Sequence, residues 1–188
     1  MTKTKLTKLI YASEHGYLDK VKALVAEGVD IHGMDNLALR KASARGHLEI
    51  VAFLISKGAD VHADTDYAIR YASEKGHLEV VQLLVSKGAD IHASRNYALV
   101  VAYEYGQVEV FDYLLEKGDW RKKDADGFTE LDKLEQDGDA VGVVAQVKKY
   151  VIAQIELEQK LEEAKRHAEA VAILRAGRKP FVIKKRAP

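Results

Sequence analysis

The chain of 188 residues contains no cysteine. Without a thiol it can form no disulfide, no cysteine-ligated zinc site and no thiol nucleophile. It also lacks an excess of either charge, because 29 Lys and Arg residues are balanced by 29 Asp and Glu residues. This balance gives no overall bias toward nucleic acid or an anionic membrane.

Long apolar runs are missing as well. No run approaches the roughly 18 to 20 residues that a membrane-spanning helix needs, and no apolar segment follows the lysines near the N-terminus as it would in a secretory signal. Hydrophobic residues nevertheless make up 47% of the chain, which is enough for the core of a folded domain. We therefore expect a soluble intracellular protein, in the cytoplasm rather than the nucleus.

A period of 30 residues runs through most of the sequence. Residues 37–66 and 67–96 are identical at 17 of 30 aligned positions, whereas about two identities would be expected by chance. A fixed period of this length is typical of a repeat protein, in which each copy packs only against its neighbours. The small residues that recur at this interval are Gly16, Gly46, Gly76 and Gly106; Gly28, Gly58, Gly88 and Gly118; and Ala12, Ala42, Ala72 and Ala102.

Each unit predicts a helix, a turn, a second helix and a loop. In residues 67–96, Ala68 and Ala72 lie four residues apart on one face of the first helix, where small side chains allow a neighbour to approach closely. Gly76 is suited to end that helix, and Leu78–Ser86 has the apolar spacing of a second helix. Helices this short are not stable alone, so stacked copies must share one core.

The segments Gly76–Asp90 and Gly46–Val51 closely resemble the second helix and the exit of the ankyrin repeat. The resemblance covers roughly Leu6 to Val151, and several units agree in register. It implies an all-α fold, an ankyrin-repeat solenoid of about five helix-turn-helix units with a long C-terminal helix. The predicted ankyrin-repeat array is 1–151, with units near 7–36, 37–66, 67–96, 97–126 and 127–151.

The units also differ from the usual ankyrin repeat, which has 33 residues and opens with Thr-Pro-Leu-His. Three residues are missing from the loop between units, so we expect the β-hairpin finger of the family to be truncated to a tight turn. This shortened form is similar to the ankyrin arrays of large DNA viruses. The last unit is closer to the family standard, because Asp126–Asp132 resembles its Asp-Gly-x-Thr-x-Leu opening.

Beyond the array, residues 152–176 predict an amphipathic helical extension that continues the second helix of the last unit. This helix could cap the end of the array, which we favour, pair with a second copy as a coiled coil to give a homodimer, or dock on a partner. Residues 177–188 form a basic tail. We expect the tail to be solvated, with contact to nucleic acid or a membrane as the alternative.

Histidines are the residues most suggestive of chemistry, because they form two ladders at the repeat interval. His32, His62 and His92 lie in the loops, while His47 and His77 lie at the start of second helices. A metal site needs ligands about 2 Å from one ion, but equivalent positions in stacked units lie about 8 to 10 Å apart. We interpret the ladders as structural and expect no metal and no cofactor. No catalytic motif occurs, so we expect neither an enzyme nor a small-molecule substrate.

The resemblance implies that a partner binds on the concave surface, to which the residues just before the glycine of each first helix point. These residues vary while the framework around them repeats, as expected if they suit a ligand. Nearby tyrosines and arginines add side chains that are favoured at interfaces, although Tyr67 and Tyr97 could instead fill the space left by the shortened finger. The predicted partner-binding residues are Glu14, His15, Arg45, Tyr67, Arg70, Tyr71, Glu74, Lys75, Tyr97, Tyr103, Glu104 and Tyr105.

Two functional hypotheses follow from these features. The first is a non-catalytic protein–protein interaction module, an adaptor or inhibitor, that binds a partner protein through the concave ankyrin surface. The second is a self-assembling structural protein, or one tethered to nucleic acid or a membrane, that acts through the C-terminal helix and the basic tail. The identity of a partner does not follow from the repeat framework, which fixes shape and leaves specificity to a few surface residues.

Overall fold

The computed structural model describes residues 2–123, 125–136 and 141–176, so the predicted basic tail at 177–188 lies outside the described residues. Within these ranges the chain is helical and contains no strand, which confirms the predicted all-α fold. The helices are α1 Thr2–Glu14, α2 Leu18–Ala26, α3 Gly33–Ala44, α4 Leu48–Ser56, α5 Ala63–Glu74, α6 Leu78–Ser86, α7 Ala93–Glu104, α8 Val108–Lys117, α9 Glu130–Gln136 and α10 Val141–Ala176.

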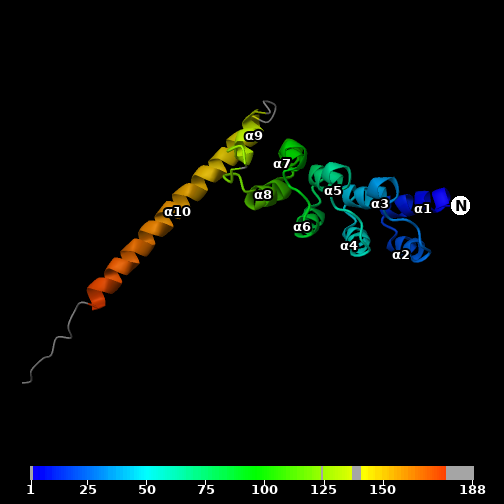
Figure 1. Ribbon diagram of the computed structural model, residues 1–188, viewed down its shortest axis with the longest axis horizontal. Helices are drawn as coiled ribbons and strands as arrows, with labels where there is room; N and C mark the ends of the chain where they lie inside the picture. The colour runs from blue at the N-terminus through cyan, green and yellow to red at the C-terminus, as the bar shows by residue number, and fades with distance from the viewer. Residues whose placement is uncertain (1, 124, 137–140, 177–188) are drawn as a thin grey trace, which may run out of the picture. The chain divides into compact units, whose positions relative to one another are not determined.

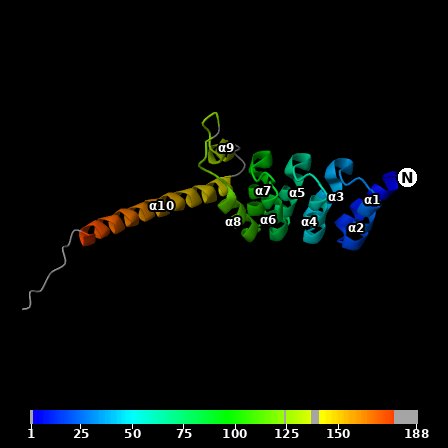
Figure 2. The same cartoon turned by 60° about the horizontal axis from the view of Figure 1, so that its bottom comes forward.

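The helices pair as first and second helices of successive units. The odd-numbered helices α1, α3, α5 and α7 lie in one row, and the even-numbered helices α2, α4, α6 and α8 lie in a second row (Figure 1, Figure 2). The chain divides into two compact parts, of which the first ends at Val147 and the second begins at Lys148. The first four units and α9 therefore belong to the first part together with the opening turns of α10.

One core runs along the first part of the chain, because equivalent apolar residues are buried in each unit. Alanine at the contact between neighbouring first helices lets them approach closely, and a leucine in each second helix fills the space beneath. Burying one leucine contributes about 1.5 to 3 kcal/mol relative to leaving it exposed. The alanines are Ala38, Ala68 and Ala98, and the leucines are Leu54, Leu84 and Leu114.

The shortened joints are left-handed turns of three residues. Each turn stands directly before the regular part of a first helix, and all nine residues have φ between 53° and 62°. Aspartate and asparagine tolerate this conformation better than other residues except glycine, and each turn ends on one of them. The three turns are Met34–Asn36, Asp64–Asp66 and Ser94–Asn96.

The last residue of each turn is buried and joins one unit to the next. The Asn36 side-chain oxygen accepts a hydrogen bond from the Asp60 backbone N–H at 2.9 Å, and Asp66 accepts one from Asp90 in the same way at 2.8 Å. Asn36 and Asp66 are only 5% and 6% exposed. Because an unpaired buried polar group is costly, these bonds fix the register of neighbouring units.

α9 and the first turns of α10 lie where the sequence predicts a fifth unit. Thr129 precedes α9, its backbone N–H donates to the Asp132 carboxylate at 2.7 Å, and the Asp132 N–H donates to the Thr129 hydroxyl at 3.0 Å. This reciprocal pair is a capping box, which stabilises the start of a helix. Val143 and Val147 of α10 are buried. The long C-terminal helix expected from the sequence is therefore one continuous helix that begins inside the array.

Candidate partner-binding surface

The residue before the glycine that ends each first helix projects into solvent. These residues are His15, Arg45, Lys75 and Tyr105, and we call them the projecting row. The side chains of Arg45 and Lys75 are 62% and 52% exposed, and Tyr105 is 60% exposed. Because they occupy equivalent positions on stacked helices, their backbones lie about 8 to 10 Å apart, and the Lys75 ammonium lies 5.9 Å from the centre of the Tyr105 ring.

Carboxylates beside the projecting row are more covered and are paired with it. The Glu14 side chain is 22% exposed and contacts Arg45 at 3.1 Å and Lys41 at 3.4 Å. The hydrogen bond from Arg45, together with the Lys41 charge, lowers the pKa of Glu14 despite its partial desolvation. Glu74, whose side chain is 12% exposed, contacts Lys75 at 2.7 Å and raises the pKa of that lysine. The basic side chains thus extend beyond the acidic ones.

A second set of side chains alternates between arginine and tyrosine across three units. Arg40, Tyr67, Arg70 and Tyr97 form this arginine–tyrosine column. The Arg40 guanidinium lies 4.9 Å from the centre of the Tyr67 ring, and the Arg70 guanidinium lies 5.8 Å from Tyr67 and 5.6 Å from Tyr97. These distances are those of cation–π contacts. Tyr67 also stacks on Tyr71, with ring centres 3.9 Å apart.

The arginines of the column also hold the left-handed turns. Arg40 donates to the Met34 carbonyl of its own helix α3 at 3.1 Å and pairs with the Asp64 carboxylate at the start of α5. Arg70 donates to the Asp64 carbonyl at 2.8 Å. Tyr67 and Tyr97 directly follow two of the turns, and burial raises the pKa of both. The column therefore combines a structural role at the shortened joints with an aromatic surface.

Two predicted residues lie apart from these sets. Tyr103 stands at the position of the buried serines of earlier units, and its ring lies 5.5 Å from Phe111. A Cβ atom at Gly142 of α10 would lie 2.8 Å from the Tyr103 ring, so this tyrosine packs on the start of α10. Glu104 is exposed at the end of α7.

At the other end of the row, His15 stacks on Tyr11 at 4.0 Å between ring centres, and its ring nitrogen lies 2.8 Å from the Tyr11 carbonyl. The structure therefore brings together Glu14, Arg45 and Lys41 in one cluster, and Arg70 with Tyr67, Tyr71 and Tyr97 in another. Asp64, which joins Arg40 to Arg70, is missing from the predicted set. The signal that could have found it is its place between two arginines spaced by one period.

Histidines of both ladders make hydrogen bonds within the protein. The ring nitrogen Nε2 of His47 donates to the Glu14 carbonyl at 3.0 Å, and Gln107 donates to the Glu74 carbonyl at 3.0 Å. His77 bonds the Ala44 carbonyl in the same way, and its desolvation lowers its pKa. In the part of the chain that the structure describes, no three His, Cys, Asp or Glu side chains are grouped so that they could hold a metal ion.

An open hollow of about 570 Å³ lies between α1 and α2. Lys8 and Lys20 line it at positions that carry the buried Ala38 and Ile50 in the second unit. In inner units this face packs against the preceding unit. The hollow therefore lies on the face of the first unit that corresponds to this packed face, with two lysines among the apolar side chains that line it.

These features define a solenoid of paired helices with a variable exposed row. Among its described residues there is no cluster of side chains that could hold a metal ion. A family profile described as ankyrin repeats, with three copies, matches residues 1–65 and 42–126. The chain belongs to the ankyrin-repeat family. Ankyrin repeats are in general non-catalytic modules for protein–protein interaction.

No curated protein matches the chain. None of the helices among the described residues is both long enough and apolar enough to span a membrane.

Proposed function

We propose that this protein is an adaptor or inhibitor that binds one partner protein through the surface formed by the projecting row and the arginine–tyrosine column. The observation that carries the proposal is the contrast between framework and row. The framework residues repeat almost unchanged, whereas the row reads His, Arg, Lys and Tyr in successive units. Stacking of the units explains why the framework residues repeat, whereas the residues of the projecting row are free to suit a ligand.

The physical character of the surface supports the same proposal. Tyrosine and arginine are enriched among the residues that dominate binding energy at interfaces. Here they project from helices whose positions are held by a shared core and by hydrogen bonds between units. Side chains presented on a rigid surface lose less conformational entropy on binding than side chains on a flexible loop.

Affinity capture from a cell lysate tests the proposal. Arg45→Ala with Lys75→Ala should reduce capture of the partner, and Tyr105→Ala should reduce it further. The matched control is Lys57→Ala with Lys87→Ala. Both pairs of basic residues stand at the ends of helices and are spaced by one unit, but Lys57 and Lys87 end second helices. Equal loss of capture in both variants, or in neither, would contradict a site on the projecting row.

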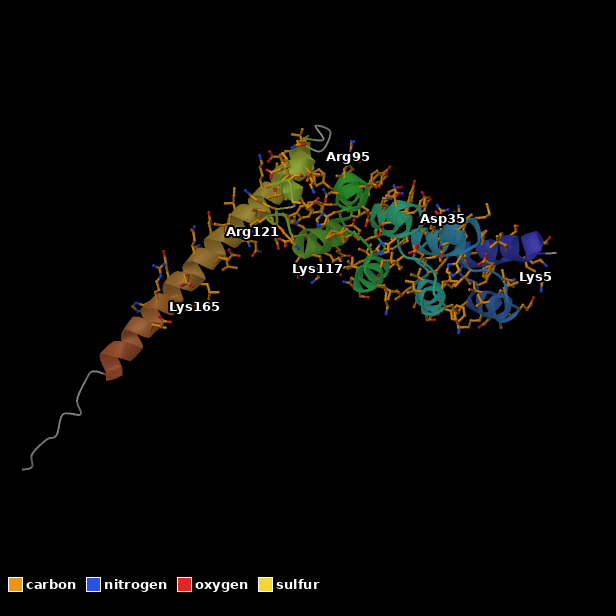
Figure 3. The ribbon with its side chains drawn as sticks, in the orientation of Figure 1. Lys5, Asp35, Arg95, Lys117, Arg121 and Lys165 are labelled. Atoms are coloured by element: carbon orange, nitrogen blue, oxygen red, sulfur yellow. The ribbon has the colours of Figure 1, made fainter. Side chains whose placement is uncertain are left out.

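A second candidate function is self-association through α10. In its part beyond Val147, Leu157 and Leu161 lie four residues apart on one face and are 61% and 56% exposed. Figure 3 shows side chains on both sides of this helix, Lys165 among them. Large exposed apolar side chains at this spacing are typical of a helix that pairs with another.

Analytical ultracentrifugation tests this second candidate. Wild-type protein should sediment as a dimer, and Leu157→Lys with Leu161→Lys should sediment as a monomer. Gln159→Lys, on the opposite face of the helix, should leave the dimer intact. A wild-type chain that stays monomeric at high concentration would exclude the homodimer.

A further inference from the structure

We infer that the segment bound by the projecting row is an acidic extended peptide with two carboxylates spaced by three residues. This inference deepens the proposed function and rests on it. It concerns the partner's chemistry, for which the charges and spacing of the row are the observations. The whole chain is neutral, and residues 1–151 carry 20 Lys and Arg residues against 24 Asp and Glu residues, so the inference depends on how these charges are distributed.

Cations outnumber carboxylates at this surface in two places. Lys41 and Arg45 share the single carboxylate of Glu14. Arg40 pairs with the Asp64 carboxylate, while Arg70 reaches only the main-chain carbonyl of that residue. The Lys75–Glu74 pair is balanced. The second and third units therefore present a local excess of positive charge, and a matching negative charge on the partner would steer association.

The exposed cations keep hydrogen-bond donors for a further carboxylate. Arg45 contacts Glu14 through one guanidinium nitrogen, although a guanidinium has five N–H donors. Lys75 contacts Glu74 through its ammonium group, which has three donors. Both side chains are more than half exposed, whereas Glu14 and Glu74 are mostly covered. An incoming carboxylate would thus meet the cations first.

The spacing of the row indicates the backbone conformation of the bound peptide and the spacing of its carboxylates. Equivalent positions on the stacked helices lie about 8 to 10 Å apart, and three residues of an extended polyproline II chain, which return the side chain to the same face, span about 9 Å. One carboxylate opposite Arg45 would place the carboxylate three residues further on opposite Lys75. The peptide residue three positions beyond the second carboxylate would then lie opposite Tyr105, whose exposed aromatic ring favours an apolar side chain.

A nucleic acid fits the same surface less well. Its phosphates carry one charge per nucleotide, whereas acidic side chains lie among the cations at Glu14, Glu74 and Glu104. A peptide can place carboxylates opposite Arg45 and Lys75 and neutral residues opposite the acids. The mixed charge of the surface therefore favours a peptide with spaced carboxylates over an evenly charged polyanion.

Fluorescence polarisation with labelled synthetic peptides tests the inference on the full chain. The probe has glutamate at two positions spaced by three residues and leucine at the next such position. Wild-type protein should bind it about tenfold more tightly than the same peptide with glutamine, which corresponds to two exposed ion pairs within their usual range. Arg45→Glu with Lys75→Glu should instead prefer the peptide with lysine at both positions.

Lys57→Glu with Lys87→Glu is the matched control, because it makes the same charge change at helix ends outside the row. This control should keep the preference for the glutamate peptide. Equal binding of the glutamate and glutamine peptides, or no binding of either, would overturn the inference. Tighter binding of oligothymidylate through Arg45 and Lys75 would also overturn it, in favour of a nucleic acid.

The lysate experiment separates failure of this inference from failure of the proposed function. If Arg45→Ala with Lys75→Ala abolishes capture of a partner while no acidic peptide binds, the site is correct and its acidic ligand is wrong. If capture does not depend on these residues and no peptide binds, the proposed function fails together with the inference.

Discussion

At the scale of single residues, the most costly feature of the fold is the left-handed backbone at its joints. A residue other than glycine in this conformation costs about 1 to 2 kcal/mol, and less for asparagine or aspartate. The cost is offset by bonds that only this geometry provides. Asn36 and Asp66 bond the next unit, and Arg40 and Arg70 donate to carbonyls within the turns.

Thr65 is the residue least suited to its place in these turns. It is exposed and β-branched, and its φ and ψ are 55° and 54°. Thr65→Asn should raise the free energy of unfolding by about 1 kcal/mol, because asparagine tolerates the left-handed region. Urea unfolding measures the change, with Thr65→Ala as a comparison that should gain less. An asparagine variant that is no more stable than wild type would contradict a strained turn.

His77 gives the array a dependence on pH. Desolvation lowers its pKa below the ordinary 6.5, assisted by His47 and Lys75 and opposed by the Ala44 carbonyl and Glu79. Because the unfolded chain then binds the proton more readily, His77 costs no stability above about pH 6.5 and destabilises the fold as the pH falls below that value.

His77→Gln tests this effect. Gln107 makes the equivalent bond in the next unit, so the variant should be nearly as stable as wild type at pH 8. Between pH 6.5 and 5 the wild type should lose more stability than the variant, as measured by urea unfolding at several pH values. The other histidines are common to both proteins and cancel in the difference. Parallel pH profiles would contradict a lowered pKa.

At the scale of elements, the start of α9 depends on one side chain. The Thr129 hydroxyl and backbone N–H both bond Asp132, which lowers the pKa of that carboxyl. Thr129→Ala should cost about 1 kcal/mol and speed hydrogen exchange in α9. Thr129→Ser keeps the hydroxyl and should exchange like wild type. Because the folded pKa of Asp132 is lowered, its contribution is present above about pH 3.8 and is lost in stronger acid.

The helices themselves could be predicted from the sequence because their signals are local. The predicted second helix Leu78–Ser86 has the bounds of α6, since apolar spacing and flanking glycines define both ends. The joints were predicted only as tight turns. Their left-handed form could not be derived, because rules for this conformation expect glycine and the turns contain none. Asparagine and aspartate at positions 36, 66 and 96 were the only local signal.

The candidate surface was predictable in position but not in its contacts. The repeat register gave the projecting row, because equivalent residues of stacked units share one face. The covering of Glu14 by Arg45 joins residues 31 positions apart, and the packing of Tyr103 on Gly142 depends on where α10 begins. Such contacts follow from the stacking of units and from the end of the array, which periodicity alone does not determine.

At the scale of the whole molecule, stability is a sum of units and their interfaces. Trp120, the single tryptophan, reports on the last of these interfaces. It is 3% exposed, its indole N–H donates to the Leu115 carbonyl at 2.8 Å, and its ring lies edge-on to His92. Its fluorescence therefore follows unfolding at the end where α9 and α10 join the array.

Deletion of Ile152–Pro188 tests which part of the molecule binds the partner. Val143 and Val147 remain, so the core at the end of the array stays covered and Trp120 fluorescence should show an unchanged unfolding midpoint. A truncation after Gln136 removes both valines and should destabilise the array by several kcal/mol, as loss of buried side chains does. The first deletion therefore separates binding from folding.

If the projecting row binds the partner, the variant lacking Ile152–Pro188 should capture it as well as the full chain does. If α10 or the basic tail is responsible, capture should be lost although the array remains folded. The midpoint of the Trp120 fluorescence transition distinguishes this second case from misfolding, because a misfolded array would lose partner capture and the fluorescence transition together. Retained capture by this variant, with loss in Arg45→Ala with Lys75→Ala, would assign partner binding to the array and leave α10 to self-association.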